Sequence, residues 1–451
     1  MGKTSATYAA IKILKAKGVL KKALIIAPLR PCHLVWPKER VKWLDFKDIS
    51  VAVLHGPKKA ESLLEPVDAH IINPEGLEWL LGMEKTKSAS GRTRVGLDVG
   101  AFKKLGYDTL IIDELTMFKH TNTVRFKALK QIVPTFARRW GLTGSPAANG
   151  LMDLFGQCYV LDEGRSLGQY ITHFRMKYFD LLRDGFTYVL RAGAEKAIYE
   201  RIQPLALRMA ADDYLDLPKL VENDVLVELP EGARAVYDRL ETDLLAAVEG
   251  GVVTAANSGV ASMKCRQVAS GGVYVDQDIL GLLKKPSTGR EWADIHKAKT
   301  EALADLIDEL QGSPLLVAYE FEHDLERIKA TLGDLPHIGG GVSTKRSTEL
   351  EAAWNAGEIP VLLAQPQSIG HGLNLQGAGH HICWYTLTWN YELYDQFNKR
   401  VHRQGNKNQR VFVHKIKARG TIDQIVDMAL KGKAKGQQAL FDALKSMRRV
   451  R

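Results

Sequence analysis

Short apolar runs alternate along the chain with longer stretches in which apolar residues recur at helical spacing. Apolar runs of four to six residues are typical of strands buried on both faces of a parallel sheet. Eight runs predict such strands: Ala23–Ala27, His70–Asn73, Thr109–Asp113, Arg139–Thr143, Leu315–Tyr319, Val361–Ala364, His381–Tyr385 and Val411–Ile416. Helical patterns lie between most of them, at Ser5–Lys17, Arg125–Val133, Thr300–Leu310 and Glu322–Leu332. This alternation predicts an α/β fold with parallel sheets.

The predicted strands form two groups, separated by a middle part of different texture. The middle part has longer helical patterns, such as Gly232–Val248, and Gly-rich stretches at Gly250–Gly259 and Gly271–Gly272. We therefore predict a first α/β lobe at residues 1–158, a mostly helical insert at 159–295 and a second α/β lobe at 296–451. At roughly 150 residues per domain, this division suits a chain of 451 residues.

The composition argues against several classes of protein. With 45% hydrophobic and 25% charged residues, the chain is of the folded globular kind and not a disordered or disulfide-stapled protein. Its four cysteines are far apart and form no Cys-x-x-Cys pair, which argues against a zinc ribbon or a redox dithiol: Cys32, Cys158, Cys265 and Cys383. No apolar run approaches the roughly 20 residues that span a bilayer. We expect no membrane partner.

The net charge of +10 is concentrated near the end of the chain. Residues 396–451 contain 15 Lys and Arg but 3 Asp and Glu, a net +12, and the remaining residues sum to −2. A basic segment on a nearly neutral body predicts contact with a polyanion. A solvated, solubilising tail would give the same composition, so the charge alone leaves both interpretations open.

Gly2, Lys3 and Thr4 precede a helical pattern, as in the last third of the phosphate-binding loop G-x-x-x-x-G-K-[ST]. In such a loop, backbone N–H groups and the helix N-terminus hold the phosphates, while the lysine reaches the β- and γ-phosphates. The hydroxyl of the threonine binds Mg²⁺. The three residues alone are a weak signal that arises often by chance.

Two predicted strands end in residues suited to nucleotide chemistry. Asp113 lies at the carboxyl end of its strand, where ligands bind in α/β folds, and is suited to hold Mg²⁺, while Glu114 is suited to orient or deprotonate an attacking water. Thr143, Gly144 and Ser145 follow another strand and suit a relay between a nucleotide and a second ligand. Ordinary strand-end turns explain the same residues without any function.

Two arginines near the end of the chain form a further candidate. Residues 371–376 read HGLNLQ, and residues 394–405 read YDQFNKRVHRQG. Arg400 and Arg403 are three apart on a predicted helix and so share one face. Such a pair can reach phosphates held by another lobe and stabilise the charge that develops in phosphoryl transfer. The alternative is that both are surface charges of the basic segment.

In this order, the segments resemble helicase superfamily two and, more narrowly, its Swi/Snf-type branch of DNA translocases. Each match alone is weak, but eight in the correct order, over nearly the whole chain, are specific. The matching residues are Gly2–Thr4, Leu24–Pro28 with Trp36–Glu39, Asp113–Thr116, Leu142–Pro146 with Asn149, Leu151, Leu154 and Phe155, Tyr214–Leu220 with Tyr237–Leu240, Gly370–Leu375, Gln396 with Arg400, His402, Arg403 and Gly405, and Val411–Lys415 with Gly420–Ile422.

The resemblance implies two RecA-like parallel-sheet lobes with a mostly helical insert between them, and ATP with Mg²⁺ in the cleft between the lobes. Catalytic roles are implied for Glu114, Arg400 and Arg403. Cofactor contacts are implied for Gly2, Lys3, Thr4, Asp113, Gly372 and Gln396, with Thr4 and Asp113 on the metal. Coupling is implied for Thr116, Thr143, Gly144 and Ser145. Contact with DNA is implied for Pro28, Arg30, Asn73 and Asn374.

Swi/Snf-like members mostly move along duplex DNA without separating its strands, so duplex DNA is the expected partner. We see no large accessory domains, which favours a bacterial or phage origin and a location in the cytoplasm of a bacterial or phage-infected cell.

Two departures from the family pattern bear on activity. The first glycine of the nucleotide loop and the strand before it are missing, so we expect Met1 to be an internal methionine of a longer chain. Thr116 stands where the family has a histidine that links the nucleotide site to the Leu142–Pro146 segment, so the coupling is expected to differ. Two rival functions stay open: a nucleic-acid-binding remnant without ATPase activity, and an ATPase that acts on another kind of partner.

Overall fold

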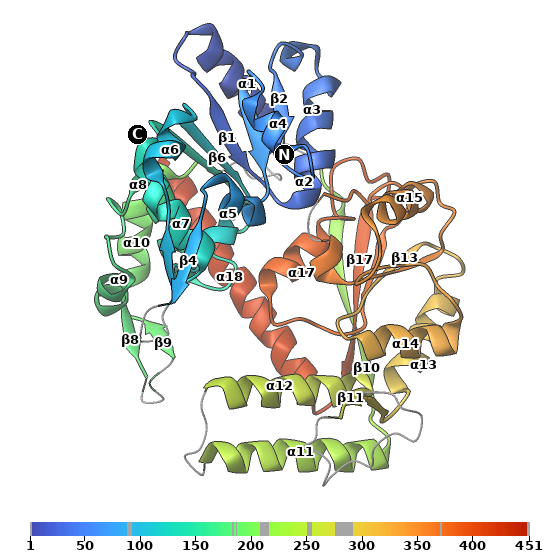
Figure 1. Ribbon diagram of the computed structural model, residues 1–451. Coiled ribbons are helices and arrows are strands. Elements are labelled where there is room, and N and C mark those ends of the chain that lie inside the picture. Colours follow the sequence, from blue (N-terminus) through green and yellow to red (C-terminus); the bar gives the residue numbers. More distant parts are fainter. Residues whose placement is uncertain are drawn as a thin grey trace. The chain divides into compact units, whose positions relative to one another are not determined.

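A computed structural model describes residues 2–87, 93–182, 185, 187–207, 216–249, 255–275, 292–369 and 372–448 (Figure 1). The chain forms two compact units, Met1–Met209 with Lys435–Arg451, and Ala210–Ala434. The motif positions Met1, Tyr214, Leu215, Gly370 and His371 lie outside the described residues. The boundaries that we propose after residues 158 and 295 stay a prediction.

A five-stranded parallel sheet forms the centre of the first unit. Its strands, in spatial order, are β2 (Val51–Val53), β3 (Ala69–Ile72), β1 (Ala23–Ile26), β6 (Thr109–Asp113) and β7 (Arg138–Leu142). Successive residues of β1 enter two different cores, with Leu24 and Ile26 on one face and Ala23 and Ile25 on the other. The inner strands β3, β1 and β6 read as nearly continuous apolar runs because helices cover both faces of the sheet.

The helices of this unit are α1 (Lys3–Ala16), α2 (Leu29–Leu34), α3 (Trp36–Lys42), α4 (Lys59–Leu64), α5 (Leu77–Leu80), α6 (Val99–Lys104), α7 (Val124–Ile132), α8 (Leu154–Asp162), α9 (Ile171–Tyr178) and α10 (Ala194–Ile202). Its 3₁₀ turns are η1 (Leu44–Phe46), η2 (Pro74–Gly76), η3 (Leu115–Phe118), η4 (Val133–Thr135), η5 (Leu151–Asp153) and η6 (Gln203–Leu205). Two antiparallel hairpins complete it: β4 (Glu84–Lys87) with β5 (Thr93–Gly96), and β8 (Phe179–Leu181) with β9 (Tyr188–Leu190).

The second unit is built on a six-stranded parallel sheet. In spatial order its strands are β10 (Lys219–Val227), β17 (Arg410–Ala418), β16 (His381–Trp384), β13 (Leu315–Ala318), β15 (Val361–Ala364) and β14 (His337–Ile338). Its helices are α11 (Glu231–Glu249), α12 (Ala255–Ser270), α13 (Ala298–Glu309), α14 (Glu322–Leu332), α15 (Thr344–Asn355), α16 (Pro366–Ile369), α17 (Tyr391–Asn398) and the first part of α18 (Ile422–Arg448). A small hairpin pairs β11 (Gly272–Tyr274) with β12 (Trp292–Asp294).

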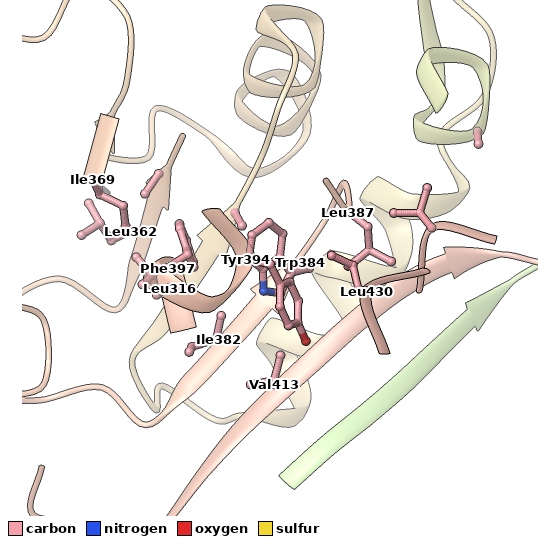
Figure 2. Close-up of a cluster of buried hydrophobic side chains, with 14 of the residues drawn as sticks. Leu316, Leu362, Ile369, Ile382, Trp384, Leu387, Tyr394, Phe397, Val413 and Leu430 are labelled. Carbon is pink, nitrogen blue, oxygen red and sulfur yellow. The ribbon is translucent and has the colours of Figure 1, made fainter. Parts of the chain in front are cut away.

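One apolar core fixes α17 on the second sheet (Figure 2). Trp384 at the end of β16 packs against Tyr394 and Phe397 of α17, with ring centroids 4.9 and 5.0 Å apart. The indole N–H of Trp384 also donates to Asn398 Oδ1 at 3.0 Å. These contacts hold the C-terminal end of α17, where the arginine segment begins.

The α/β fold with two parallel sheets is confirmed, and all eight predicted strands are present. β10 was not predicted, because its apolar residues alternate with charged ones instead of forming a continuous run. That alternation suits its place: β10 is an edge strand paired only with β17 among the described strands, over nine residues. None of the helices in the described part is long and apolar enough to cross a membrane.

An ion network around two buried lysines ties β10, β17 and α18 together. Lys415 Nζ lies 2.8 Å from both Glu222 and Asp427, and Lys417 Nζ lies 2.7 Å from Asp224 and 2.9 Å from Asp427. Burial alone would raise the pKa of Asp427, but hydrogen bonds from its lysine partners hold that pKa well below the usual range. Lys415 and Lys417 of the basic segment are therefore buried and paired with carboxylates, so they are not available to a polyanion.

We predict that Asp427→Asn lowers the free energy of unfolding by about 3 kcal/mol at neutral pH, because it leaves two buried ammonium groups short of an anion. Urea unfolding measures this loss. A carboxylate with a depressed pKa stabilises the fold above its unfolded pKa and ceases to do so as pH falls through the folded one. The gap between variant and wild type should therefore shrink below about pH 4. Asp238→Asn removes an exposed carboxylate that pairs with the partly exposed Arg234, and should cost about 0.5 kcal/mol or less. An equal loss in both variants would contradict the prediction.

Candidate functional site

The carboxyl edge of the first sheet gathers most of the residues singled out by the sequence. Asp113 ends β6, Thr143 follows β7, Pro28 follows β1 and Asn73 follows β3. Because neighbouring parallel strands end at the same edge, residues from distant parts of the sequence converge here. Two of them, Glu114 and Thr143, are in direct contact: Thr143 Oγ1 donates to Glu114 Oε1 at 3.5 Å.

The N-terminus of α1 meets this edge through Lys3. Lys3 Nζ lies 4.0 Å from Glu114 Oε2, and the two side chains are 37% and 14% exposed. Gly2 is the N-cap of α1, with φ 60°, and has no side chain that could cap the first-turn amides. The first turn also contains no acidic residue, so the positive end of the helix dipole is not neutralised from within.

Glu114 adopts a left-handed backbone conformation, with φ 66° and ψ 65°. A non-glycine residue in this region is strained by about 1 kcal/mol and turns the chain sharply away from the strand. The turn is fitted closely to β7, because a Cβ on Gly141 would come within 2.4 Å of Leu115 Cδ2. Packing therefore holds Glu114 at the strand end in spite of the strain.

The coupling candidates continue along the same edge. Thr143 Oγ1 accepts from the backbone N–H of Ser145 at 3.2 Å while it donates to Glu114. Thr116 and Ser145 are buried, at 5% and 2% exposure. A Cβ on Gly144 would meet nothing within 4 Å, so Gly144 is not required by packing there. The structure thus places Thr143 between Glu114 and Ser145.

Asp113 has a partner that the sequence did not suggest. The indole N–H of Trp36, in α3, donates to Asp113 Oδ2 at 3.0 Å, and Trp36 is fully buried. The sequence placed Trp36 only in a segment resembling a DNA contact. The one available signal was a tryptophan at the start of α3, the second helix after the first strand.

These residues fit a phosphate ester with a divalent cation. A lysine and an uncapped helix N-terminus offer positive charge to phosphate oxygens, and Thr4 offers a hydroxyl in the first turn. The carboxylate of Asp113 is an oxygen ligand of the kind that Mg²⁺ prefers. Lys3, Thr4 and Asp113 are thus the residues of this unit that would hold Mg²⁺ with a nucleotide.

The predicted DNA contacts of this unit differ in what they offer. Pro28 is the N-cap of α2, which begins directly after β1, and Arg30 lies in the first turn of that helix. Asn73 is 7% exposed, and its Nδ2 donates to Glu75 Oε2 at 2.7 Å. A phosphate requires a donor, and the bond to Glu75 uses one of the two N–H groups of Asn73 Nδ2. The DNA contact at Asn73 stays a prediction.

In the second unit, the helical placement of the two arginines is wrong. α17 ends at Asn398, so Arg400 and Arg403 lie in the turns that follow. The chain leaves the helix because the carbonyl of Arg400 accepts from the backbone N–H of Leu375 at 3.1 Å. The arginines nevertheless converge on one loop: Arg400 Nη1 donates to Leu373 O at 3.1 Å, and Arg403 donates to Asn374 Oδ1.

The loop that receives them is fixed from α15. Glu351 Oε1 accepts from the backbone N–H of Asn374 at 2.8 Å, and Asn355 Nδ2 donates to Asn374 O at 2.7 Å. Gly372 opens the loop with φ 88°, a conformation that favours glycine. The predicted DNA contact Asn374 is therefore engaged with Arg403.

Gln396 lies in the last turn of α17, shortly before the two arginines in the sequence. Its Nε2 donates to Glu392 Oε1 at 3.4 Å, whereas its Oε1 is buried and has no hydrogen-bond partner among the described residues. A buried acceptor without a partner is costly unless a ligand or water satisfies it. This observation fits the cofactor contact predicted for Gln396.

Comparisons with known proteins agree with the motifs. Residues 1–271 match the SNF2-related domain, and residues 298–405 match the helicase conserved C-terminal domain. Protein p41 of Acyrthosiphon pisum secondary endosymbiont phage 1 is 32% identical over 462 residues, which cover 99% of this chain and 93% of that protein. A Mycoplasma genitalium protein named "Uncharacterized ATP-dependent helicase MG018" is 27% identical over 72% of this chain, which spans only 29% of that protein.

Among solved structures, the Sulfolobus solfataricus SWI2/SNF2 ATPase core in complex with dsDNA is similar over 99% of this chain and 90% of that chain. The two share 20% sequence identity, and the TM-score is 0.40.

The contact between Glu351 and the Asn374 amide yields a prediction about the loop. Glu351→Ala should speed hydrogen exchange of the Asn374 amide about tenfold, the effect of losing one charge-assisted hydrogen bond. Hydrogen–deuterium exchange with mass spectrometry measures it. Glu349→Ala, which removes only an exposed pair with Arg346 on the same helix, is the control. Unchanged exchange in Glu351→Ala would show that this contact does not hold the loop.

Proposed function

Because this chain belongs to the SNF2-related family of helicase superfamily two, we propose that it is an ATP-dependent translocase that moves along duplex DNA. The observation that carries the proposal is the meeting of Lys3, Asp113 and Glu114 at one sheet edge. Two acidic residues and a lysine at a helix N-terminus are the parts that phosphoryl transfer to water requires. Lys3 is far from the adjacent pair Asp113 and Glu114 in the sequence, so their convergence is a property of the fold.

The first unit binds the nucleotide. Lys3 and the first-turn amides of α1 hold the phosphates, and Thr4 and Asp113 hold Mg²⁺. Bound Mg²⁺ neutralises charge on the phosphates and on the leaving group. The pair between Lys3 and Glu114 is long and partly exposed, worth about 1 kcal/mol or less, so a phosphate can readily displace Glu114 from Lys3.

Glu114 then orients the attacking water and accepts its proton. Its strained conformation aims the carboxylate out of the strand end, and Thr143 gives it a hydrogen bond. Thr143 also holds the Ser145 amide, so a change at Glu114 reaches the Gly144–Ser145 turn. Thr143, Gly144 and Ser145, with the buried Thr116, form the proposed coupling path.

The second unit supplies Arg400 and Arg403, which stabilise the charge that develops on the phosphoryl group. Arg403 is the better candidate for direct contact, because it is exposed whereas Arg400 is half-buried and bonded to the Leu373 carbonyl. Gln396 and Gly372 complete the proposed cofactor contacts. Closure around the nucleotide and reopening after hydrolysis would drive movement.

We propose duplex DNA as the partner, bound mainly through its phosphates. Pro28, Arg30 and Asn73 of the first unit and Asn374 of the second are the proposed contacts. Such binding is largely independent of sequence and weakens steeply with salt. A phage protein similar over almost its whole length supports a location in the cytoplasm of a bacterial or phage-infected cell.

ATP hydrolysis by this chain, with and without duplex DNA, tests the function. Turnover stimulated by duplex DNA supports a translocase. Salt-dependent DNA binding without turnover would identify a binding protein instead. Turnover that DNA does not change would identify an ATPase with another kind of partner.

Glu114→Gln should abolish hydrolysis yet retain ATP binding, because the amide keeps the shape of the side chain but cannot take a proton. Steady-state turnover and equilibrium binding of a fluorescent ATP analogue check both halves. Normal turnover in this variant would remove Glu114 from its proposed role.

Arg403→Ala should lower kcat about 10³-fold while leaving ATP binding by the first unit in place. Arg346→Ala is the matched control, since Arg346 is also an exposed arginine of the second unit and pairs with Glu349 on its own helix. If both variants keep wild-type kcat, Arg403 is a surface charge and not part of the catalytic site.

A further inference from the structure

Trp36 is a buried tryptophan that contacts Asp113 at the end of β6 and Tyr8 of α1, and it follows α2 in the chain. The proposed function treats these three segments as separate. Trp36 has no exposed surface, and its indole N–H donates to Asp113 Oδ2 at 3.0 Å. Packing alone does not require this bond, because a phenylalanine would fill most of the same apolar volume. The bond fixes one oxygen of Asp113 and thereby the orientation of its whole carboxylate.

The backbone of Trp36 is held from α1. Tyr8 OH donates to Trp36 O at 2.9 Å, and the two rings pack edge to face with centroids 5.4 Å apart. Tyr8 lies one helical turn after Thr4 on α1 and is itself fully buried. The helix that begins with Lys3 and Thr4 is thus locked to the residue that orients Asp113.

The same tryptophan comes directly after the segment proposed to contact DNA. α2 begins after Pro28, and Trp36 begins α3 two residues after α2 ends. Cys32, in the middle of α2, donates from Sγ to Ala27 O at 3.1 Å, which ties the helix to the end of β1. A displacement of Pro28 or Arg30 by bound DNA therefore has a short, packed route to Trp36.

We propose that Trp36 is a positioning residue that makes the metal site at Asp113 respond to DNA held at Pro28 and Arg30. This inference rests on the proposed function, since it takes Mg²⁺ at Asp113 and DNA at the α2 segment. When DNA moves α2 and α3, the indole N–H carries the Asp113 carboxylate with it. By reciprocity, Mg²⁺ with nucleotide at Asp113 changes the affinity for DNA by the same factor.

Trp36→Phe tests the bond, because it removes the N–H and keeps an aromatic ring in the core. Trp43→Phe is the matched control: the Trp43 indole N–H also donates to a carboxylate, Glu39 Oε1 at 2.8 Å, but on the exposed surface of the same segment. Tyr8→Phe removes only the hydroxyl that holds the Trp36 carbonyl, and it carries the test if Trp36→Phe does not fold.

Two equilibrium measurements separate positioning from simple structural loss. The first is affinity for a fluorescent ADP analogue with Mg²⁺ and with EDTA. The second is affinity for a short DNA duplex with and without Mg²⁺ and a non-hydrolysable ATP analogue. In Trp36→Phe, the gain in nucleotide affinity from Mg²⁺ should fall about tenfold, the effect of one hydrogen bond to a charged group, while affinity in EDTA stays unchanged. The factor by which nucleotide changes DNA affinity should fall toward one.

Tyr8→Phe should change both quantities in the same direction but less, and Trp43→Phe should match the wild type. If the wild type binds Mg²⁺-nucleotide and DNA, and Trp36→Phe keeps its Mg²⁺ dependence and its coupling, the inference fails and the proposed function stands. Equal loss of nucleotide affinity in EDTA and in Mg²⁺ would also overturn it, since that is the result of general damage. A wild type that binds no nucleotide would overturn the proposed function and the inference with it.

Discussion

The burial of β6 on both faces is the constraint on which the first unit depends. Leu110, Ile111 and Ile112 have no exposed surface, and their alternating side chains enter two different cores. Only the end of such a strand can carry charge, so Asp113 and Glu114 are forced to the sheet edge. The strained turn at Glu114 is tolerated because Leu115 packs against Gly141 and fixes the chain on its far side.

Both units hold charged side chains in a fixed orientation, but with different hydrogen-bond partners. In the first, acidic residues stand at a strand end and are oriented by an indole N–H and a threonine hydroxyl. In the second, cations stand in turns after a helix and are oriented by a carbonyl and an amide oxygen of one loop. In both units a charged side chain is held by neutral dipoles, which orient it without cancelling its charge. A strong ion pair would have neutralised the group that, in the proposed function, meets a phosphate or a cation.

Continuous apolar runs in the sequence predict the buried strands. The sequence predicts few of the features that depend on single polar contacts. All eight predicted strands form, and most of them are buried on both faces, whereas β7 at the sheet edge is only half-buried. The convergence of Asp113, Thr143 and Pro28 follows from parallel strands. β10 escaped notice because an edge strand alternates charged and apolar residues. The end of α17 also escaped, since the bond from the Leu375 amide to the Arg400 carbonyl joins residues 25 apart in the sequence. Helical spacing therefore paired two arginines that do converge on one loop, although neither lies in a helix.

Net charge is also a limited guide, because it does not show which cations are buried. This affects the interpretation of the basic segment, residues 396–451. Its composition favours a polyanion, but Lys415 and Lys417 are paired with Glu222, Asp224 and Asp427 inside the fold. A lysine buried in a β-strand and one on a loop contribute equally to net charge, and only burial tells them apart. Net charge therefore overstates, by Lys415 and Lys417, the positive charge that the segment can offer to a polyanion. At the edge of the first sheet single polar contacts matter more: the indole of Trp36 orients the proposed metal ligand Asp113, and Trp36 follows the helix that carries the proposed DNA contact Arg30.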